Sequence, residues 1–136
     1  EATPAIFAFA AAAEAGMQTF RQDTAREKEL LNSLCEKLSA LPGLVLTGAH
    51  EAPHILNIAI PGVPTQNTIN ILQDAGICVS AGSACAKGHR SHVLTAMGIP
   101  GETIDSAFRV SLCRDNTQEE IDTLVEVIRR DILPRI

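Results

Sequence analysis

The stretch AFRVSLCRDNTQEEIDTLVEVI, residues 107–128, holds a strand pattern and a helix pattern in direct succession. Residues 107–112 alternate between apolar and polar, which predicts a strand with Phe108 and Val110 on its buried face. Residues 117–120 (TQEE) have the pattern of a capping box, which predicts the first turn of a helix. A strand followed by an amphipathic helix is typical of an α+β fold. The apolar stripe of that helix is Ile121, Leu124, Val125 and Ile128.

Helix and strand patterns are mixed over the rest of the chain. Apolar periodicity predicts helices over 6–15 and 20–40. Gly16 either interrupts the first helix or only weakens it, and Pro42-Gly43 ends the second. We therefore expect one domain over residues 1–136, with an α+β fold in which helices cover a small, mostly antiparallel sheet. Further strands are predicted over 44–47, 55–60 and 77–80, and further helices after Thr65 and over 92–97.

The composition excludes several classes of partner. With 11 basic and 16 acidic residues, the net charge is −5, which disfavours nucleic acid and anionic membranes as main partners. Four Phe and no Tyr or Trp leave few platforms for base stacking, and no apolar run is long enough to span a bilayer. Four cysteines without a signal peptide favour reduced thiols, and we predict a cytoplasmic location.

The segment VSAGSACAKG, residues 79–88, surrounds Cys85 with small and flexible residues. Lys87 adds a positive charge nearby, which favours the thiolate over the thiol. A cysteine that serves packing is expected within an apolar run, as Cys35 and Cys78 are. We therefore predict that Cys85 is a reactive thiol on a mobile loop.

Two other uses of this cysteine fit the sequence less well. Cys78, Cys85, His89 and His92 have the spacing C-x6-C-x3-H-x2-H, whereas structural zinc sites favour cysteine pairs two to four residues apart. A cysteine–histidine dyad is weakly supported, because the local signatures of such dyads do not transfer between families. We expect no metal site.

Arg109 is the second candidate for chemistry, because it lies within the predicted apolar strand. An arginine in that position must either reach solvent or meet an anion. Its planar guanidinium is suited to a bidentate grip on a substrate carboxylate. Asn57 lies on the polar side of the strand predicted over 55–60, where it could meet either solvent or a ligand.

These motifs together resemble the NifS/IscS-type cysteine desulfurases, relatives of the class V aminotransferases that use pyridoxal phosphate. SAGSAC (80–85) is similar to the active-site cysteine loop of that family. EATPAI (1–6) resembles the residues directly after the family's G-T dipeptide, and HILNI (54–58) resembles its P-x-x-L-N strand. FRVSL (108–112) with NTQEEID (116–122) resembles its I-R-x-S-L…T-x-E-E-I-D segment, so the likeness covers nearly the whole chain.

The resemblance implies a function and a site. Cys85 would attack the sulfur of L-cysteine bound to the cofactor, leaving alanine and an enzyme persulfide. Arg109 would hold the substrate carboxylate, with Asn57 as a further substrate-binding residue. The persulfide would pass to an acceptor, such as an iron–sulfur scaffold protein or the machinery of tRNA thiolation, and the full-length enzyme would be a homodimer. The remaining loop residues implied are Ser80, Gly82, Ser83 and Ala84.

One departure from the family concerns its Schiff-base lysine, which lies in an S-x-H-K context. None of Lys28, Lys37 and Lys87 has that context, so no cofactor-binding residue is expected in this chain. The chain resembles the C-terminal small domain of fold-type I pyridoxal phosphate enzymes, with the large lysine-bearing domain missing, and should be inactive alone. The alternatives are a stand-alone sulfur-carrier or interaction module, or a relative of selenocysteine lyase or cysteine sulfinate desulfinase.

Overall fold

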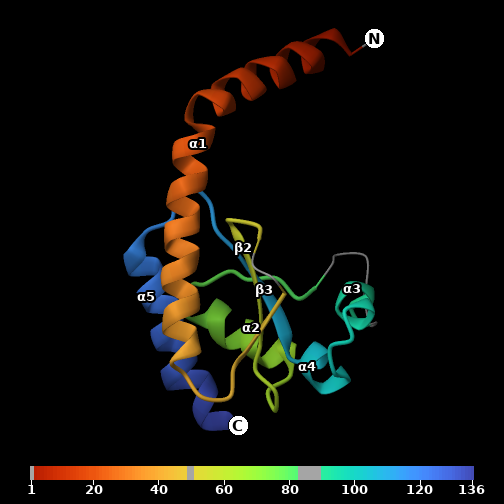
Figure 1. Cartoon of the computed structure of the whole chain (residues 1–136), viewed down its shortest axis with the longest axis vertical. Helices are drawn as coiled ribbons and strands as arrows, with labels where there is room; N and C mark the ends of the chain where they lie inside the picture. The colour runs from red at the N-terminus through yellow and green to blue at the C-terminus, as the bar shows by residue number, and fades with distance from the viewer. Residues whose placement is uncertain (1, 49–50, 83–89) are drawn as a thin grey trace.

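The computed structural model describes residues 2–48, 51–82 and 90–136. Within these ranges, the centre is a three-stranded antiparallel sheet in the order β1 (Val45–Thr47), β2 (Ile55–Ala59) and β3 (Ala107–Ser111). Helices pack around this sheet (Figure 1). The predicted α+β class with a small antiparallel sheet is therefore confirmed.

The helices in the described ranges are α1 (Thr3–Ser39), α2 (Thr65–Asp74), α3 (His92–Ala96), α4 (Gly101–Asp105) and α5 (Gln118–Val127). A π-helical segment (Ile128–Ile132) and a 3-10 turn (Leu133–Arg135) come after α5. The predicted capping box is present at the start of α5: the Thr117 hydroxyl accepts from the Glu120 N–H, and the Glu120 carboxylate accepts from the Thr117 N–H. No helix among the described residues is both long and apolar enough to cross a membrane.

The main hydrophobic core lies between one face of the sheet and helices α1, α2 and α5. Strand alternation puts Leu56 and Ile58 of β2, and Phe108 and Val110 of β3, on this face. Figure 1 shows α5 beside the lower half of α1. The helices contribute Leu31, Leu34 and Leu38 from α1, Leu72 from α2 and Leu124 from α5.

The opposite face of the sheet is covered at one end. Ala59 and Ala107 pack there in a second, smaller cluster with Leu94 of α3 and Ile104 of α4. Farther along the strands, this face carries polar side chains, among them that of Arg109.

Helix α1 differs from the prediction, because residues 3–39 form one helix rather than two. Gly16 lies inside this helix, and no atom would come within 4 Å of a Cβ added to it. A glycine costs a helix only about 1 kcal/mol relative to alanine, and the alanine-rich turns before it favour helix. Of the two expected effects of Gly16, the structure shows the weaker one, a helix that continues, and Figure 1 shows a bend in the N-terminal part of α1.

Residues 77–80 also differ from the prediction. They do not form a buried strand: only Ser80 pairs, through an isolated bridge to Arg109. Cys78, expected inside the core, is exposed. Helix α4 was not predicted, because it lacks the side-chain N-cap that Ser91 provides for α3, a helix of the same length.

Candidate functional site

Strand pairing assembles a row of polar residues across the partly open face of the sheet. Thr47 of β1 is the register partner of Asn57 in β2, and Asn57 is the partner of Arg109 in β3. Arg109 in turn is bridged to Ser80. Residues directly opposite each other in a sheet share a face, so Thr47, Asn57, Arg109 and Ser80 lie side by side on one face.

The hydrogen-bonding pattern between β2 and β3 places Asn57 and Arg109 at the kind of position where opposite side chains lie close together. The Leu112 N–H donates to the His54 carbonyl over 2.8 Å, and paired residues in an antiparallel ladder alternate between bonded and non-bonded positions. Counting back from that pair, Asn57 and Arg109 occupy a non-bonded position, where side chains approach most closely. The Arg109 N–H and carbonyl bond Ser80 on the other side instead, over 2.7 and 3.0 Å.

The charge of this site comes from Arg109, whose side chain is exposed. Among the described residues, its guanidinium makes no hydrogen bond and no ion pair, which leaves its donors available to an anion. Asn57 is half-buried, and its Oδ1 accepts from the Thr47 hydroxyl over 2.5 Å. A guanidinium beside an amide is suited to binding a carboxylate.

The row leads directly into the cysteine segment. Two residues after Ser80, Gly82 adopts a left-handed conformation with φ of 58° that favours glycine. The Ser80 hydroxyl lies 3.5 Å from the Gly82 carbonyl, at the limit of a hydrogen bond. Ser83, Ala84 and Cys85 lie outside the described residues, so their predicted roles stay predictions.

Arg90, the first described residue after the cysteine segment, is held in place by Asp105. Its guanidinium donates twice to the Asp105 carboxylate, over 2.8 and 2.6 Å, and these bonds hold the pKa of Asp105 below its usual range. Gly101 makes room for this pair, because a Cβ added there would lie 2.5 Å from an Arg90 nitrogen. The sequence offered no signal for this contact, since its partners are 15 residues apart.

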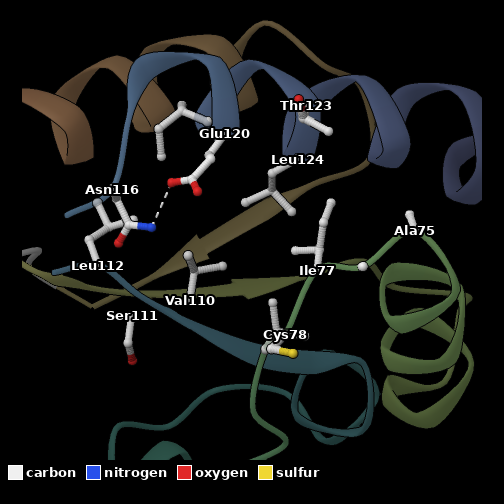
Figure 2. Close-up of a pocket in the computed structure, with 13 residues that line it drawn as sticks. Ala75, Ile77, Cys78, Val110, Ser111, Leu112, Asn116, Glu120, Thr123 and Leu124 are labelled. Atoms are coloured by element: carbon white, nitrogen blue, oxygen red, sulfur yellow. Dashed lines mark hydrogen bonds between the residues drawn. The ribbon is translucent and has the colours of Figure 1, made fainter.

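Three of the four cysteines lie in the described ranges, and their surroundings differ. Burial raises the pKa of the half-buried Cys35 thiol, whereas Cys78 and Cys113 are exposed. Figure 2 shows Cys78 on the wall of a cavity of about 400 Å³, across from Glu120, which is hydrogen-bonded to Asn116. Within the described ranges, no group of three or more His, Cys, Asp or Glu side chains is arranged to hold a metal ion.

The lysines do not fit a cofactor site on the polar row. Lys37 lies on α1, across the sheet from Arg109, and is paired with Asp122 of α5. Lys28 is on the same helix and exposed, and Lys87 lies outside the described residues. The described part of the chain therefore offers no lysine to hold pyridoxal phosphate beside Asn57 and Arg109.

Comparison with known proteins identifies the class of protein. The model of the aminotransferase class-V family matches residues 1–124. The chain therefore belongs to the class-V aminotransferase family.

Within that family, the similar proteins are cysteine desulfurases. The cysteine desulfurase of Nostoc sp. is 34% identical over 133 residues, which cover 94% of this chain and 33% of that protein. The cysteine desulfurase IscS of Escherichia coli is 37% identical over 111 residues, covering 79% of this chain and 27% of that protein. The predicted resemblance to NifS/IscS-type enzymes is confirmed, and the chain spans about a third or less of the length of these relatives.

Solved structures agree with this assignment. A NifS-like protein superposes on 100% of this chain and 35% of its own, with a TM-score of 0.82 and 28% identity. The NifS-like protein of Rickettsia africae covers 82% of this chain and 29% of its own, with a TM-score of 0.71 and 28% identity.

Proposed function

We propose that this chain is the C-terminal domain of a pyridoxal phosphate-dependent cysteine desulfurase and supplies its nucleophile, Cys85. The observation that carries the proposal is the row of Asn57, Arg109 and Ser80, which leads along the chain into the segment SAGSAC. Removal of sulfur from an amino acid needs one group that holds the carboxylate and another that attacks the sulfur. Arg109 is suited to the first task and a thiolate to the second.

In the proposed reaction, Arg109 and Asn57 bind the carboxylate of L-cysteine while the Cys85 thiolate attacks its sulfur. A sulfur–sulfur bond forms as the substrate's carbon–sulfur bond breaks. The carbon keeps the electron pair of the broken bond and takes a proton, which gives alanine and a persulfide on Cys85. The transferred sulfur and the Cys85 sulfur are each formally oxidised by one electron and the carbon is reduced by two, so no outside oxidant is needed.

Pyridoxal phosphate supplies an electron sink in such chemistry. Because no described lysine is placed to hold it, we assign its binding to the part of a longer enzyme outside this chain, and we expect this chain alone to be inactive. The persulfide would then pass to an acceptor such as an iron–sulfur scaffold protein. The resemblance also supports a cytoplasmic homodimer as the full-length form.

The first part of α1 supports the assignment of residues 1–136 to one domain of a larger protein. We call residues 3–20 the apolar arm; five of its large apolar side chains are between 59% and 77% exposed. Glu14 is the only charged residue in the arm, and a helix that is apolar all round is normally buried. We propose that the lysine-bearing domain covers this arm. The five side chains are Ile6, Phe7, Phe9, Met17 and Phe20.

The proposal is tested by sulfide release from L-cysteine, with pyridoxal phosphate and a reductant, in the full natural polypeptide that contains this chain. We expect sulfide from the wild type, almost none from Cys85→Ala, and a nearly unchanged rate from the control Cys113→Ser. A persulfide should be found on Cys85 by mass spectrometry when the reductant is left out.

The other outcomes separate the alternatives. Sulfide release that persists in Cys85→Ala would contradict the assigned nucleophile. A folded polypeptide that releases no sulfide but takes up persulfide from a donor would favour a sulfur-carrier module. Faster turnover of selenocysteine or cysteine sulfinate than of L-cysteine would favour the related lyase or desulfinase activity.

A further inference from the structure

Thr47 makes a contact that the proposed reaction leaves unused. It lies on β1 next to Asn57, is only 6% exposed, and donates its hydroxyl proton to Asn57 Oδ1 over 2.5 Å. The same hydroxyl lies 3.5 Å from the Asn57 backbone carbonyl. Both contacts of the Thr47 hydroxyl are therefore with Asn57.

This contact determines which end of the Asn57 amide faces Arg109. An asparagine side chain has an oxygen that accepts and an NH2 group that donates, and the two diverge from one carbon. With its oxygen held toward Thr47, the NH2 group faces away from β1. Because β2 lies between β1 and β3, that direction is the side of Arg109.

The opposite orientation would work against binding of an anion. If Oδ1 faced Arg109, it would accept from the guanidinium and present a partial negative charge to an incoming carboxylate. With the observed orientation, the guanidinium and the amide NH2 group both donate outward. A carboxylate can accept from both groups at once, because it has two oxygens with free lone pairs.

We propose that Thr47 is a positioning residue: its hydroxyl holds the Asn57 amide so that the NH2 group, together with Arg109, binds the α-carboxylate of an amino-acid substrate. The inference rests on the proposed function, since it deepens the role of the same site. Thr47 itself touches no reacting atom; it acts through Asn57.

The test uses steady-state kinetics of the full-length enzyme with L-cysteine. Thr47→Val keeps the shape and the β-branch of the side chain but removes the donor. Loss of one neutral hydrogen bond of this kind predicts a rise in KM of about fivefold to tenfold with kcat within about twofold. Thr47→Ser keeps the hydroxyl and should restore a KM close to that of the wild type.

A double-mutant cycle separates positioning from a general structural effect. On an Asn57→Ala background, Thr47→Val should raise KM no further, because the amide that it orients is gone. Inhibition by L-alanine should weaken in parallel with KM, whereas inhibition by alaninamide, which lacks the carboxylate, should not change. If Thr47→Val fails to fold, Asn57→Asp provides the second test: replacement of the donating NH2 group by an acceptor should raise KM more than Asn57→Ala does.

The outcomes distinguish the two levels of the proposal. If Arg109→Ala raises KM strongly and Thr47→Val leaves it unchanged, the role of Thr47 is overturned while the carboxylate site stands. If Thr47→Val raises KM equally with and without Asn57, the role of Thr47 is likewise overturned. If Arg109→Ala leaves both KM and kcat unchanged, the carboxylate site itself is wrong, and the inference about Thr47 is overturned with it.

Discussion

Arg109 and Phe108 are neighbours in the chain, yet they lie on opposite faces of β3. Successive side chains of a strand alternate between faces, so Phe108 is fully buried in the core and Arg109 is exposed on the polar side. That alternation can be read from the sequence, which is why the placement of Arg109 could be predicted. Its approach to Asn57 depends on the register between β2 and β3, which a single sequence does not reveal.

Cys78 shows where the same reasoning fails at the scale of single residues. Its apolar neighbours indicated a buried strand, but only Ser80 of that segment pairs with β3, and Cys78 is exposed beside a cavity. An apolar run predicts burial without showing which part of the protein covers it. Cys35, on α1, is partly buried as expected.

We predict that the four cysteines differ in reactivity, with Cys85 alkylated fastest and Cys35 slowest. Burial raises the pKa of the Cys35 thiol, so a smaller fraction is thiolate at pH 8, and only the thiolate reacts. Its rate should keep increasing as the pH rises above the ordinary range of a thiol. Timed iodoacetamide labelling, read peptide by peptide by mass spectrometry, measures all four rates. Equal rates for Cys35 and the exposed Cys113 would contradict the effect of burial.

The start of α5 shows what can be predicted at the scale of an element. Thr117 and Glu120 form the capping box that the sequence pattern indicated, because all its atoms lie within one helical turn. Asn116 adds a bond that the pattern did not show: its amide donates to Glu120 Oε2 over 2.9 Å. Short-range features of this kind follow from local sequence. The contact between Arg90 and Asp105 joins residues 15 apart in the chain, so it does not follow from local sequence.

The hydrogen bonds at this helix start predict a pH dependence of stability. Donation from Asn116 and from the Thr117 N–H lowers the pKa of Glu120 below its ordinary value. A carboxyl group whose pKa is lower in the folded state stabilises the fold above its unfolded pKa, and this contribution is lost as the pH falls through the folded pKa. Glu120→Gln should therefore lower the free energy of unfolding at pH 7, and the difference from the wild type should shrink in acid.

Glu119→Gln is the matched control. Glu119 lies in the same first turn of α5, and its replacement by Gln removes the same charge. Among the described residues, however, the Glu119 carboxylate accepts no hydrogen bond. Urea unfolding at pH 7 and at about pH 3.5, below the ordinary Glu pKa, compares the variants. An equal loss for the two variants at pH 7 would show that charge near the helix end matters and the capping bonds do not.

At the scale of the whole molecule, α1 divides into two parts with different surroundings. Its second half places Leu34 and Leu38 in the core, fully buried, and packs against α5. The apolar arm, by contrast, extends away from the sheet (Figure 1). The leucine stripe was predicted from its periodicity. The sequence left open whether Gly16 interrupts the helix or only weakens it, because a single glycine costs a helix little, and the structure shows one continuous helix.

The exposure of the arm leads to a prediction that depends on which polypeptide is measured. In this chain alone, Phe9→Ala should change the free energy of unfolding by less than about 0.5 kcal/mol, because the Phe9 side chain is 77% exposed. Leu34→Ala, on the same helix but fully buried, should cost about 2–5 kcal/mol. In the full-length protein, where we propose that the lysine-bearing domain covers the arm, Phe9→Ala should cost about 3–5 kcal/mol.

Urea unfolding of both variants in both polypeptides separates the causes. A loss on Phe9→Ala that appears only in the full-length protein means that the arm becomes buried there, as a helix that is apolar on all sides requires. A neutral Phe9→Ala in both polypeptides, alongside a destabilising Leu34→Ala, would leave the arm exposed in the complete enzyme and would contradict the proposed domain arrangement. If this chain alone shows the loss, with a concentration-dependent midpoint and dimers in sedimentation, a second copy covers the arm instead, since self-association makes stability depend on concentration.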